Sequence, residues 1–368
     1  MTAATDKNVN VLSTIILSFV LTLAGQDSEF DKFQKLVELG RQAEAKGNYA
    51  EAERHFRSAV DLADASGAST ADRSAAFSDL GHLLLKEDRF AESEKFFDRA
   101  LEIARSSPGG ENNLPVLLNN LGALYSLTGR YARSESLLNE AKKLTEQKLG
   151  PEQPPMSEIM NNFGILYWVT DKPKLAETHL RKALALNEKQ VGPNHPTVAL
   201  VLNNLADIYV KQKKWDVAEP LLRRALQIIQ TSFSPGHPDA SFTLNSLGFV
   251  YGGRKNLPEA EKVFRQSLEI RRNVFGANHS SVAVAEANLA AILTGRGKYG
   301  EAETLFVDAL QILEKKPGER SLELPSILEA YALLLRLKSA EEASAMEARA
   351  KSIRTRMGYT TSAEGLKK

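Results

Sequence analysis

The sequence predicts an all-α protein, a solenoid of stacked helix–turn–helix repeats, and two observations carry this prediction. A short pattern recurs: PNHPTVALVLNNLADIY at residue 193 returns 42 residues later as PGHPDASFTLNSLGFVY. Within each unit, apolar residues follow the spacing of an amphipathic helix twice, with a polar turn between the two stripes. A feature repeated at fixed period belongs to the architecture, so the repeat defines the fold.

Small residues mark the register of the repeat. The first set is spaced 41 or 42 residues apart and comprises Gly40, Gly81, Gly122, Gly164, Ala206, Gly248, Ala290 and Ala332. We call the member of this set in each repeat its marker. Twelve residues after the first seven markers, and again seven residues later, comes another alanine or serine. Small side chains at fixed positions on two amphipathic segments let two helices approach closely.

The repeat that begins at residue 193 shows how one unit is built. Its first apolar stripe occupies positions 198, 202, 205, 206 and 209, and its second occupies 218, 221, 222, 225 and 229. KQKKW forms the turn, and Pro196 suits the first helical turn, where its missing N–H is not needed. Such a unit cannot bury its apolar face alone. Stacked units therefore share one core, and we expect contacts only between neighbouring repeats.

Composition limits the classes of function. The chain has 368 residues with 47 basic and 46 acidic side chains, a formal net charge of +1. This balance gives no electrostatic footprint for nucleic acid or for an anionic membrane surface. Cysteine is absent, which excludes disulfides, thiol catalysis and cysteine metal sites.

The N-terminus carries an uncharged apolar run, VNVLSTIILSFVLTLA, over residues 9–24. Lys7 precedes this run, and the small residues Ala24 and Gly25 close it, as in a secretory signal peptide. We expect residues 1–25 to be a signal peptide cleaved near Gly25, which predicts a secreted or periplasmic protein. The run is short for a spanning helix, which needs about 20 apolar residues. Two alternatives stay open: a retained membrane anchor, and a buried helix of a cytoplasmic protein.

The residues that could carry chemistry do not compose an active site. His195, His237 and His279 recur at 42-residue intervals. Equivalent points on successive repeats lie about 10 Å apart, whereas two imidazoles on one zinc ion need nitrogens within about 4 Å. We expect these histidines to satisfy the backbone in their loops. Glu–Arg pairs four residues apart, such as Glu177 with Arg181, suit helix surfaces. The chain is predicted not to be an enzyme and to need no cofactor or metal.

Two stretches, NNLGALYSLTGRYARSESLLNEA (119–141) and NLAAILTGRGKYGEAETLFVDAL (288–310), resemble tetratricopeptide repeats. The 42-residue period, the GPNHPTVA loop and the NNLA helix are similar to the repeat subtype of kinesin light chains. This resemblance covers roughly residues 30–353. It implies a right-handed superhelical solenoid over 26–354, with seven clear repeats, a degenerate eighth that caps the array, and a flexible tail at 355–368.

The resemblance also implies where a partner binds. In this family the first helix of each repeat lines the concave surface, and residues six and three before the marker, and one and four after it, face the groove. Kinesin light chains hold an extended cargo peptide there, with asparagine amides contacting its backbone. An amide offers both a donor and an acceptor, so it can bind a peptide of any sequence. The predicted peptide-binding residues are Asn119, Asn161, Asn203, Asn245, Ile165, Trp168, Val210 and Phe249.

Alternatives remain for several of these residues. The four groove asparagines could be solvated or form interhelical hydrogen bonds, and Trp168 and Phe249 could pack between repeats. A second asparagine stands one residue further along the register in four repeats. These second asparagines are expected to hydrogen-bond the neighbouring helix, and they are Asn120, Asn162, Asn204 and Asn288.

The predicted function is a non-catalytic protein–protein interaction scaffold that binds an extended peptide segment in its concave groove. No lysine or arginine occupies the groove positions of the four asparagine repeats, so a basic clamp for a C-terminal carboxylate is missing. The expected partner is a protein or peptide, with no nucleic acid and no small-molecule substrate, and a membrane only if the N-terminal segment is uncleaved. The alternative is a regulatory or substrate-recruiting subunit of a larger complex whose partner carries the catalysis.

Overall fold

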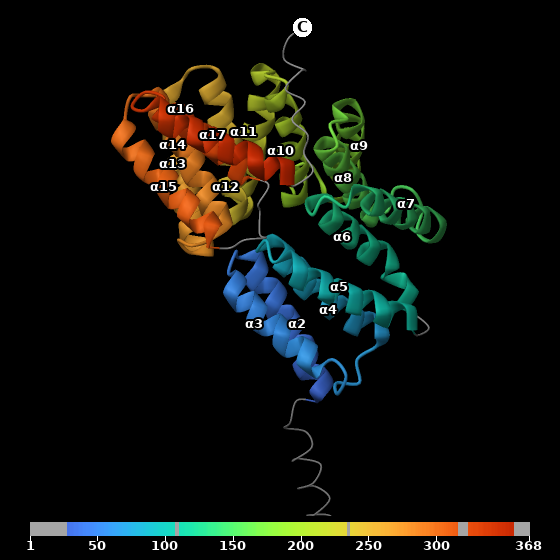
Figure 1. The fold of residues 1–368 in the computed structure, drawn as a ribbon. Helices are drawn as coiled ribbons and strands as arrows, with labels where there is room; N and C mark the ends of the chain where they lie inside the picture. The colour runs from blue at the N-terminus through green and yellow to red at the C-terminus, as the bar shows by residue number, and fades with distance from the viewer. Residues whose placement is uncertain (1–27, 107–109, 234–235, 316–322, 357–368) are drawn as a thin grey trace, which may run out of the picture.

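The structure, a computed structural model, describes residues 28–106, 110–233, 236–315 and 323–356, and within these ranges the chain forms α-helices and one short 3-10 helix but no strand (Figure 1). The helices pack in sequential pairs: α2 (Glu29–Ala45) with α3 (Tyr49–Leu62), α4 (Thr70–Lys86) with α5 (Phe90–Ser106), α6 (Leu114–Leu127) with α7 (Tyr131–Lys148), α8 (Pro154–Val169) with α9 (Pro173–Val191), α10 (Pro196–Lys211) with α11 (Trp215–Ser232), α12 (Pro238–Gly253) with α13 (Leu257–Phe275), α14 (Ser280–Gly295) with α15 (Tyr299–Glu314), and α16 (Leu324–Leu335) with α17 (Ala340–Arg356). The 3-10 helix η1 (Gly110–Asn112) precedes α6. The predicted all-α solenoid is confirmed.

The ends of the chain limit what can be compared with the sequence analysis. The predicted signal peptide, residues 1–25, lies outside the described residues, and so does residue 357 onward. The predicted tail begins at residue 355, but Thr355 and Arg356 still belong to α17.

The markers hold each helix pair together. The five glycine markers each lie against a large side chain sixteen residues further on. A Cβ atom added to Gly164 would lie 2.5 Å from Cγ of Leu180, and one added to Gly248 would lie 2.5 Å from Cζ of Phe264. Both distances are shorter than a real carbon–carbon contact, which is about 3.5–4.0 Å. The missing side chain is therefore what lets the paired helices approach so closely.

The turn inside each pair depends on one residue in the left-handed conformation, seven positions after the marker. Glycine occupies this position in three repeats, where φ is 76° for Gly47, 77° for Gly129 and 74° for Gly297. Residues with a side chain occupy it in four others, with φ of 61° or 57°, and these are Asp88, Asp171, Lys213 and Lys255. Because only glycine adopts this conformation without a steric cost, the four side chains mark turns that the packing of the helices imposes.

The stack is curved, and the first helices of the repeats line its inside. Successive first helices pack against one another, most closely α6 with α8, α10 with α12 and α14 with α16. No comparable packing joins successive second helices in the described ranges. Helices that touch lie on the shorter side of a curve, so the first helices form the inner surface of the solenoid and the second helices form the outer surface (Figure 1).

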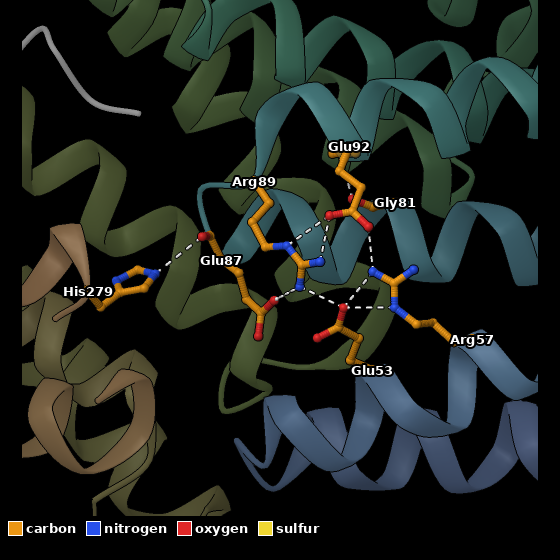
Figure 2. A network of polar contacts seen from close by, with 8 residues as sticks. Glu53, Arg57, Gly81, Glu87, Arg89, Glu92 and His279 are labelled. Carbon is orange, nitrogen blue, oxygen red and sulfur yellow. Dashed lines mark hydrogen bonds and ion pairs between the residues drawn. The ribbon is translucent and has the colours of Figure 1, made fainter. Parts of the chain in front are cut away.

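The curvature brings the first two repeats against the sixth and seventh. The Ser280 hydroxyl donates to Oδ2 of Asp88 at 2.8 Å, across 192 residues of sequence. Nδ1 of His279 accepts a backbone N–H, so its Nε2 carries the proton and donates to the backbone oxygen of Glu87 at 3.2 Å (Figure 2). The expectation of contacts only between neighbouring repeats is therefore wrong. The rotations between successive repeats add up until distant loops meet.

Apolar contacts extend this junction, which we call the seam. The rings of Tyr49 and Phe275 lie 5.5 Å apart between centroids. A Cβ atom on Gly47 would lie 2.6 Å from Cδ of Pro238, so the turn after α2 and the start of α12 are in direct contact. The seam joins the turns that follow α2 and α4 to the segments that precede α12 and α14.

The marker contact predicts opposite effects for two glycine-to-alanine changes. Gly164→Ala places a methyl group against Leu180 and should lower the free energy of unfolding by about 1–3 kcal/mol, as overpacking does. Gly300→Ala in α15 adds its methyl group in open space, and should be neutral or stabilise by up to about 1 kcal/mol. Denaturant unfolding measures both. Equal effects of the two changes would contradict the packing role of the marker.

The seam predicts a long-range effect of one histidine. His279→Ala and His195→Ala each remove a helix cap, because Nδ1 of each imidazole accepts the backbone N–H two residues on, at 3.2 Å and 3.3 Å. In the described residues, His279 also donates a hydrogen bond to the backbone oxygen of Glu87, and His195 does not. Hydrogen exchange in residues 84–90 should therefore rise in His279→Ala and stay unchanged in His195→Ala. Unaltered exchange there in both variants would show that the seam contributes nothing to stability.

Candidate functional site

The inner surface carries exposed apolar side chains at equivalent positions of the third, fifth and sixth repeats, whereas the fourth repeat has Glu158 there. Val116, Leu200 and Phe242 all stand six residues before their markers, and they are 38%, 54% and 44% exposed. Phe249, one residue after its marker, is 43% exposed. Single exposed apolar residues are ordinary, whereas a repeated stripe on a concave surface is typical of a binding site.

The eight predicted peptide-binding residues lie on the first helices α6, α8, α10 and α12, but they differ in access. Phe249 is exposed, and Ile165, Trp168, Val210 and Asn245 are partly buried. The other three asparagines are nearly enclosed, at 3% for Asn119, 6% for Asn161 and 9% for Asn203. Whether a peptide contacts these residues stays a prediction.

Both aromatic residues of the predicted set also make contacts within the chain. The Lys211 ammonium lies 4.4 Å from the centroid of the Trp168 ring. The ring of Phe249 meets Phe264 edge-on at 5.5 Å. Phe249 therefore packs on one side and is open on the other, while Trp168 is partly covered by a lysine.

Asparagine side chains join successive repeats along the inner surface. In three places the second asparagine of one repeat donates from Nδ2 to Oδ1 of the first asparagine in the repeat before: Asn162 to Asn119 at 2.9 Å, Asn204 to Asn161 at 2.8 Å and Asn288 to Asn245 at 2.8 Å. Asn120 instead donates to Ser78 at 3.2 Å. These bonds confirm the interhelical role expected of the second asparagines. They also occupy the amide oxygens of Asn119, Asn161 and Asn245, and Nδ2 of Asn161 donates to Oδ1 of Asn162 at 3.4 Å.

The connection between α10 and α12 departs from this pattern. Ser246 stands where the other connections have an asparagine, and its hydroxyl donates to Oδ1 of Asp207 at 2.6 Å. Asn203 donates to the Thr243 hydroxyl at 2.9 Å, and its own Oδ1 is buried without a hydrogen-bond partner among the described residues. An unsatisfied amide oxygen therefore lies one helical turn from a carboxylate.

Two carboxylates on the inner surface have raised pKa values. Burial raises the pKa of Asp207 from 3.8 to about 6, although the Ser246 hydroxyl acts in the opposite direction. Glu158 is open to solvent but lies within the curve of the solenoid. This enclosure raises its pKa, and His82 on α4 offsets part of the effect. In the part of the chain that the structure describes, neither carboxylate forms an ion pair. Sequence analysis overlooked Glu158, which its place six residues before a marker could have revealed.

The inner surface of the first two repeats is different, because its charges are paired. Arg41 binds Asp79 at 2.8 Å. Glu44 lies 3.4 Å from the His82 ring and 2.8 Å from the Lys86 ammonium. Burial alone would raise the pKa of Glu44, but His82 and Lys86 outweigh burial and hold the pKa at about 2.

A network of charged residues joins the first two repeats away from the inner surface, and Figure 2 shows its members pointing toward one another. Glu53 of α3 accepts from Arg57 at 2.7 Å and from Arg89 at 2.6 Å. Both arginines also bind Glu92 of α5, and Arg89 reaches Glu87 at 3.1 Å. Each carboxylate here faces a guanidinium. The network joins the first two repeats.

Equivalent glutamates connect later repeats in the same way. The predicted pairs four residues apart are present, with Glu177 and Arg181 at 2.7 Å. The glutamates also reach into the next repeat: Glu177 accepts from the Tyr209 hydroxyl at 2.8 Å, and Glu261 binds Lys298 at 2.8 Å. The sequence analysis did not predict these links between repeats. In the sequence, each link joins a glutamate to a tyrosine 32 residues later or to a lysine 37 residues later.

The repeated histidines have the structural role that the sequence predicts. His195, His237 and His279 cap the helices that follow them, because Nδ1 of each accepts the backbone N–H two residues on. Among the described residues, no group of three or more histidines or carboxylates is arranged to hold a metal ion. Within the same ranges, no helix is long and apolar enough to cross a membrane.

The outer surface also has a hollow, a groove of about 720 Å³ between α11 and α13. Its floor is apolar and includes Ile229, Leu244 and Val263. Its rim carries Glu259 and Lys262, which pair with each other at 3.1 Å.

Comparisons with known proteins concern the whole array. A family model described as tetratricopeptide repeat matches residues 31–106, 72–147, 113–189, 155–231, 197–273 and 239–315. A comparison with curated proteins gives no match.

Several solved structures are similar to this chain at low identity. BtubC (BKLC) from P. vanneervenii is 24% identical, with 66% of this chain and 92% of that chain covered and a TM-score of 0.46. A putative kinesin light chain with nearly identical repeats from Podosopora anserina is 20% identical over 55% of this chain and 95% of that chain, at 0.43. PilF of Pseudomonas aeruginosa is 22% identical over 67% and 93%, also at 0.43.

The raised pKa of Asp207 predicts that replacing this residue by a neutral one stabilises the protein, and that the gain depends on pH. Because the folded pKa, about 6, exceeds the ordinary 3.8, the protonated carboxyl favours the folded state, and this contribution is lost as pH rises through 6. Asp207→Asn should therefore raise the free energy of unfolding by about 1–2 kcal/mol at pH 8, since one pKa unit is worth about 1.4 kcal/mol and partial exposure reduces the effect. The difference from wild type should vanish near pH 4. A gain that does not change with pH would contradict the assignment.

Proposed function

Because the chain belongs to the tetratricopeptide repeat family, whose domains generally act as protein–protein interaction modules, we propose that it is a non-catalytic scaffold that holds an extended segment of a partner protein on its inner surface. A catalytic domain is not among the regions that the family comparison identifies. The partner supplies any chemistry, so the chain can also serve as a substrate-recruiting subunit of a larger complex.

The observation that carries this proposal is the exposed apolar stripe on the inner surface. Side chains at equivalent positions of the neighbouring helices α10 and α12, Leu200 and Phe242, lie about 10 Å apart. An extended segment advances about 3.3 Å per residue. Each repeat therefore meets about every third residue of such a segment.

The other predicted residues complete the surface. Ile165, Val210 and Phe249 add apolar area between the repeats, and the open part of Trp168 lies at the end of α8. The groove asparagines supply donors to backbone carbonyls of the segment where their Nδ2 groups are free of neighbouring repeats. Their inter-repeat bonds fix the direction of these amides in advance, which lowers the entropic cost of binding.

The proposal predicts which surface substitutions weaken binding. A partner captured from the native host and then purified should bind the variant Leu200→Ser/Phe249→Ser at least tenfold more weakly, because two apolar contacts are lost on the inner surface. The matched control is Leu175→Ser/Val217→Ser, which changes side chains 46% and 44% exposed on the second helices α9 and α11. Calorimetry gives both affinities, and thermal unfolding checks that each variant folds. Unchanged affinity in the inner variant, or equal loss in the control, would refute the inner surface as the binding site.

A further inference from the structure

The middle of the inner surface has a distinctive charge. On α6, α8, α10 and α12, the positions that face the groove hold two charged side chains, Glu158 and Asp207, and both are acidic. Neither has an ion-pair partner within the described ranges. The nearest basic residue along α10 is Lys211, which pairs with Asp171 at 3.2 Å. On the inner surface of the first two repeats, Arg41 is likewise paired with Asp79, and Lys86 with Glu44.

The two carboxylates occupy opposite corners of one patch. Glu158 and Ile165 are seven residues apart on α8, and Leu200 and Asp207 are seven apart on α10. Seven helical residues span about 10 Å, and neighbouring helices lie about 8–10 Å apart. The four residues form a rectangle. Glu158 and Asp207 lie at opposite corners, about 14 Å apart, and Ile165 and Leu200 lie at the other two corners.

A second observation places an unmet acceptor in the same patch. Asn203 is 9% exposed and lies one turn before Asp207 on α10. In the other connections, the corresponding Oδ1 faces an asparagine of the next repeat, but here Ser246 turns to Asp207 and leaves Oδ1 without a partner among the described residues. The patch thus combines two unpaired carboxylates with an unsatisfied amide oxygen, and all three groups favour a cationic donor.

We propose that the segment held on the inner surface is basic: it carries two lysine or arginine side chains about four residues apart, one for Glu158 and one for Asp207, with an apolar residue midway between them. The spacing follows from about 14 Å at about 3.3 Å per extended residue. Side chains of an extended segment alternate between two faces, so the residue midway between the two cations shares their face and lies between Ile165 and Leu200. This inference rests on the proposed function and specifies the chemistry of its partner.

Synthetic peptides test the charge requirement. The probe is a fluorescent ten-residue peptide with the core Lys-Ser-Leu-Ser-Lys, and its comparison peptide has methionine in place of both lysines. The lysine peptide should bind wild type at least fivefold more tightly. Glu158→Gln and Asp207→Asn should each weaken it by about 1.5- to fivefold, the range for exposed ion pairs. The double variant should bind both peptides equally. Asp216→Asn is the control, because it removes the same charge from a side chain 98% exposed on α11.

The outcomes separate this inference from the proposed function. If both peptides bind wild type equally and Phe249→Ser weakens both, the inner surface binds segments but has no preference for basic ones, and the inference fails alone. If neither peptide binds, the inference also fails, whereas the proposed function is judged on the captured partner. Equal weakening by Asp216→Asn would show a general effect of net charge and would overturn the role of the two carboxylates.

Discussion

The rest of the structure depends on one contact, in which a residue with little or no side chain lies against a large side chain sixteen positions later. Where the marker is Gly164, its partner is Leu180, and no Cβ atom fits between them. This contact sets the distance and angle within a helix pair. Since five of the pairs share this contact at a glycine marker, these repeats present the same surfaces to their neighbours, and the array follows.

Polar groups then fix how one repeat follows another. Asparagine pairs such as Asn204 with Asn161 join the first helices, and glutamates such as Glu261 join a second helix to the next turn. Together they hold the curvature that brings the first helices to the inside. The same curvature carries the loops before α12 and α14 to the first two repeats, where the seam makes the array more than a chain of nearest neighbours (Figure 1).

Sequence periodicity was sufficient to predict the helix pairs, because they depend on local spacing, whereas the resemblance to tetratricopeptide repeats implied which helices line the inner surface. The helix α10 begins at Pro196 and gives way to the predicted turn after Lys211. The seam could not be predicted, since it arises from small rotations summed over several repeats. The same holds for the burial of Asn119, which depends on how closely α6 and α8 approach. Glu158 occupies a position that is apolar in the third, fifth and sixth repeats. A prediction based on repeated residues therefore does not detect it.

The claim that a partner lies on the inner surface is tested most directly by photo-crosslinking. A photoreactive phenylalanine derivative placed singly at Leu200 or Val116, on the inner surface, should crosslink to the captured partner in the native complex. The same derivative at Val217 or Leu175, on the outer helices, should give no crosslink. Crosslinks confined to the outer positions, beside the groove between α11 and α13, would contradict the assignment of the inner surface.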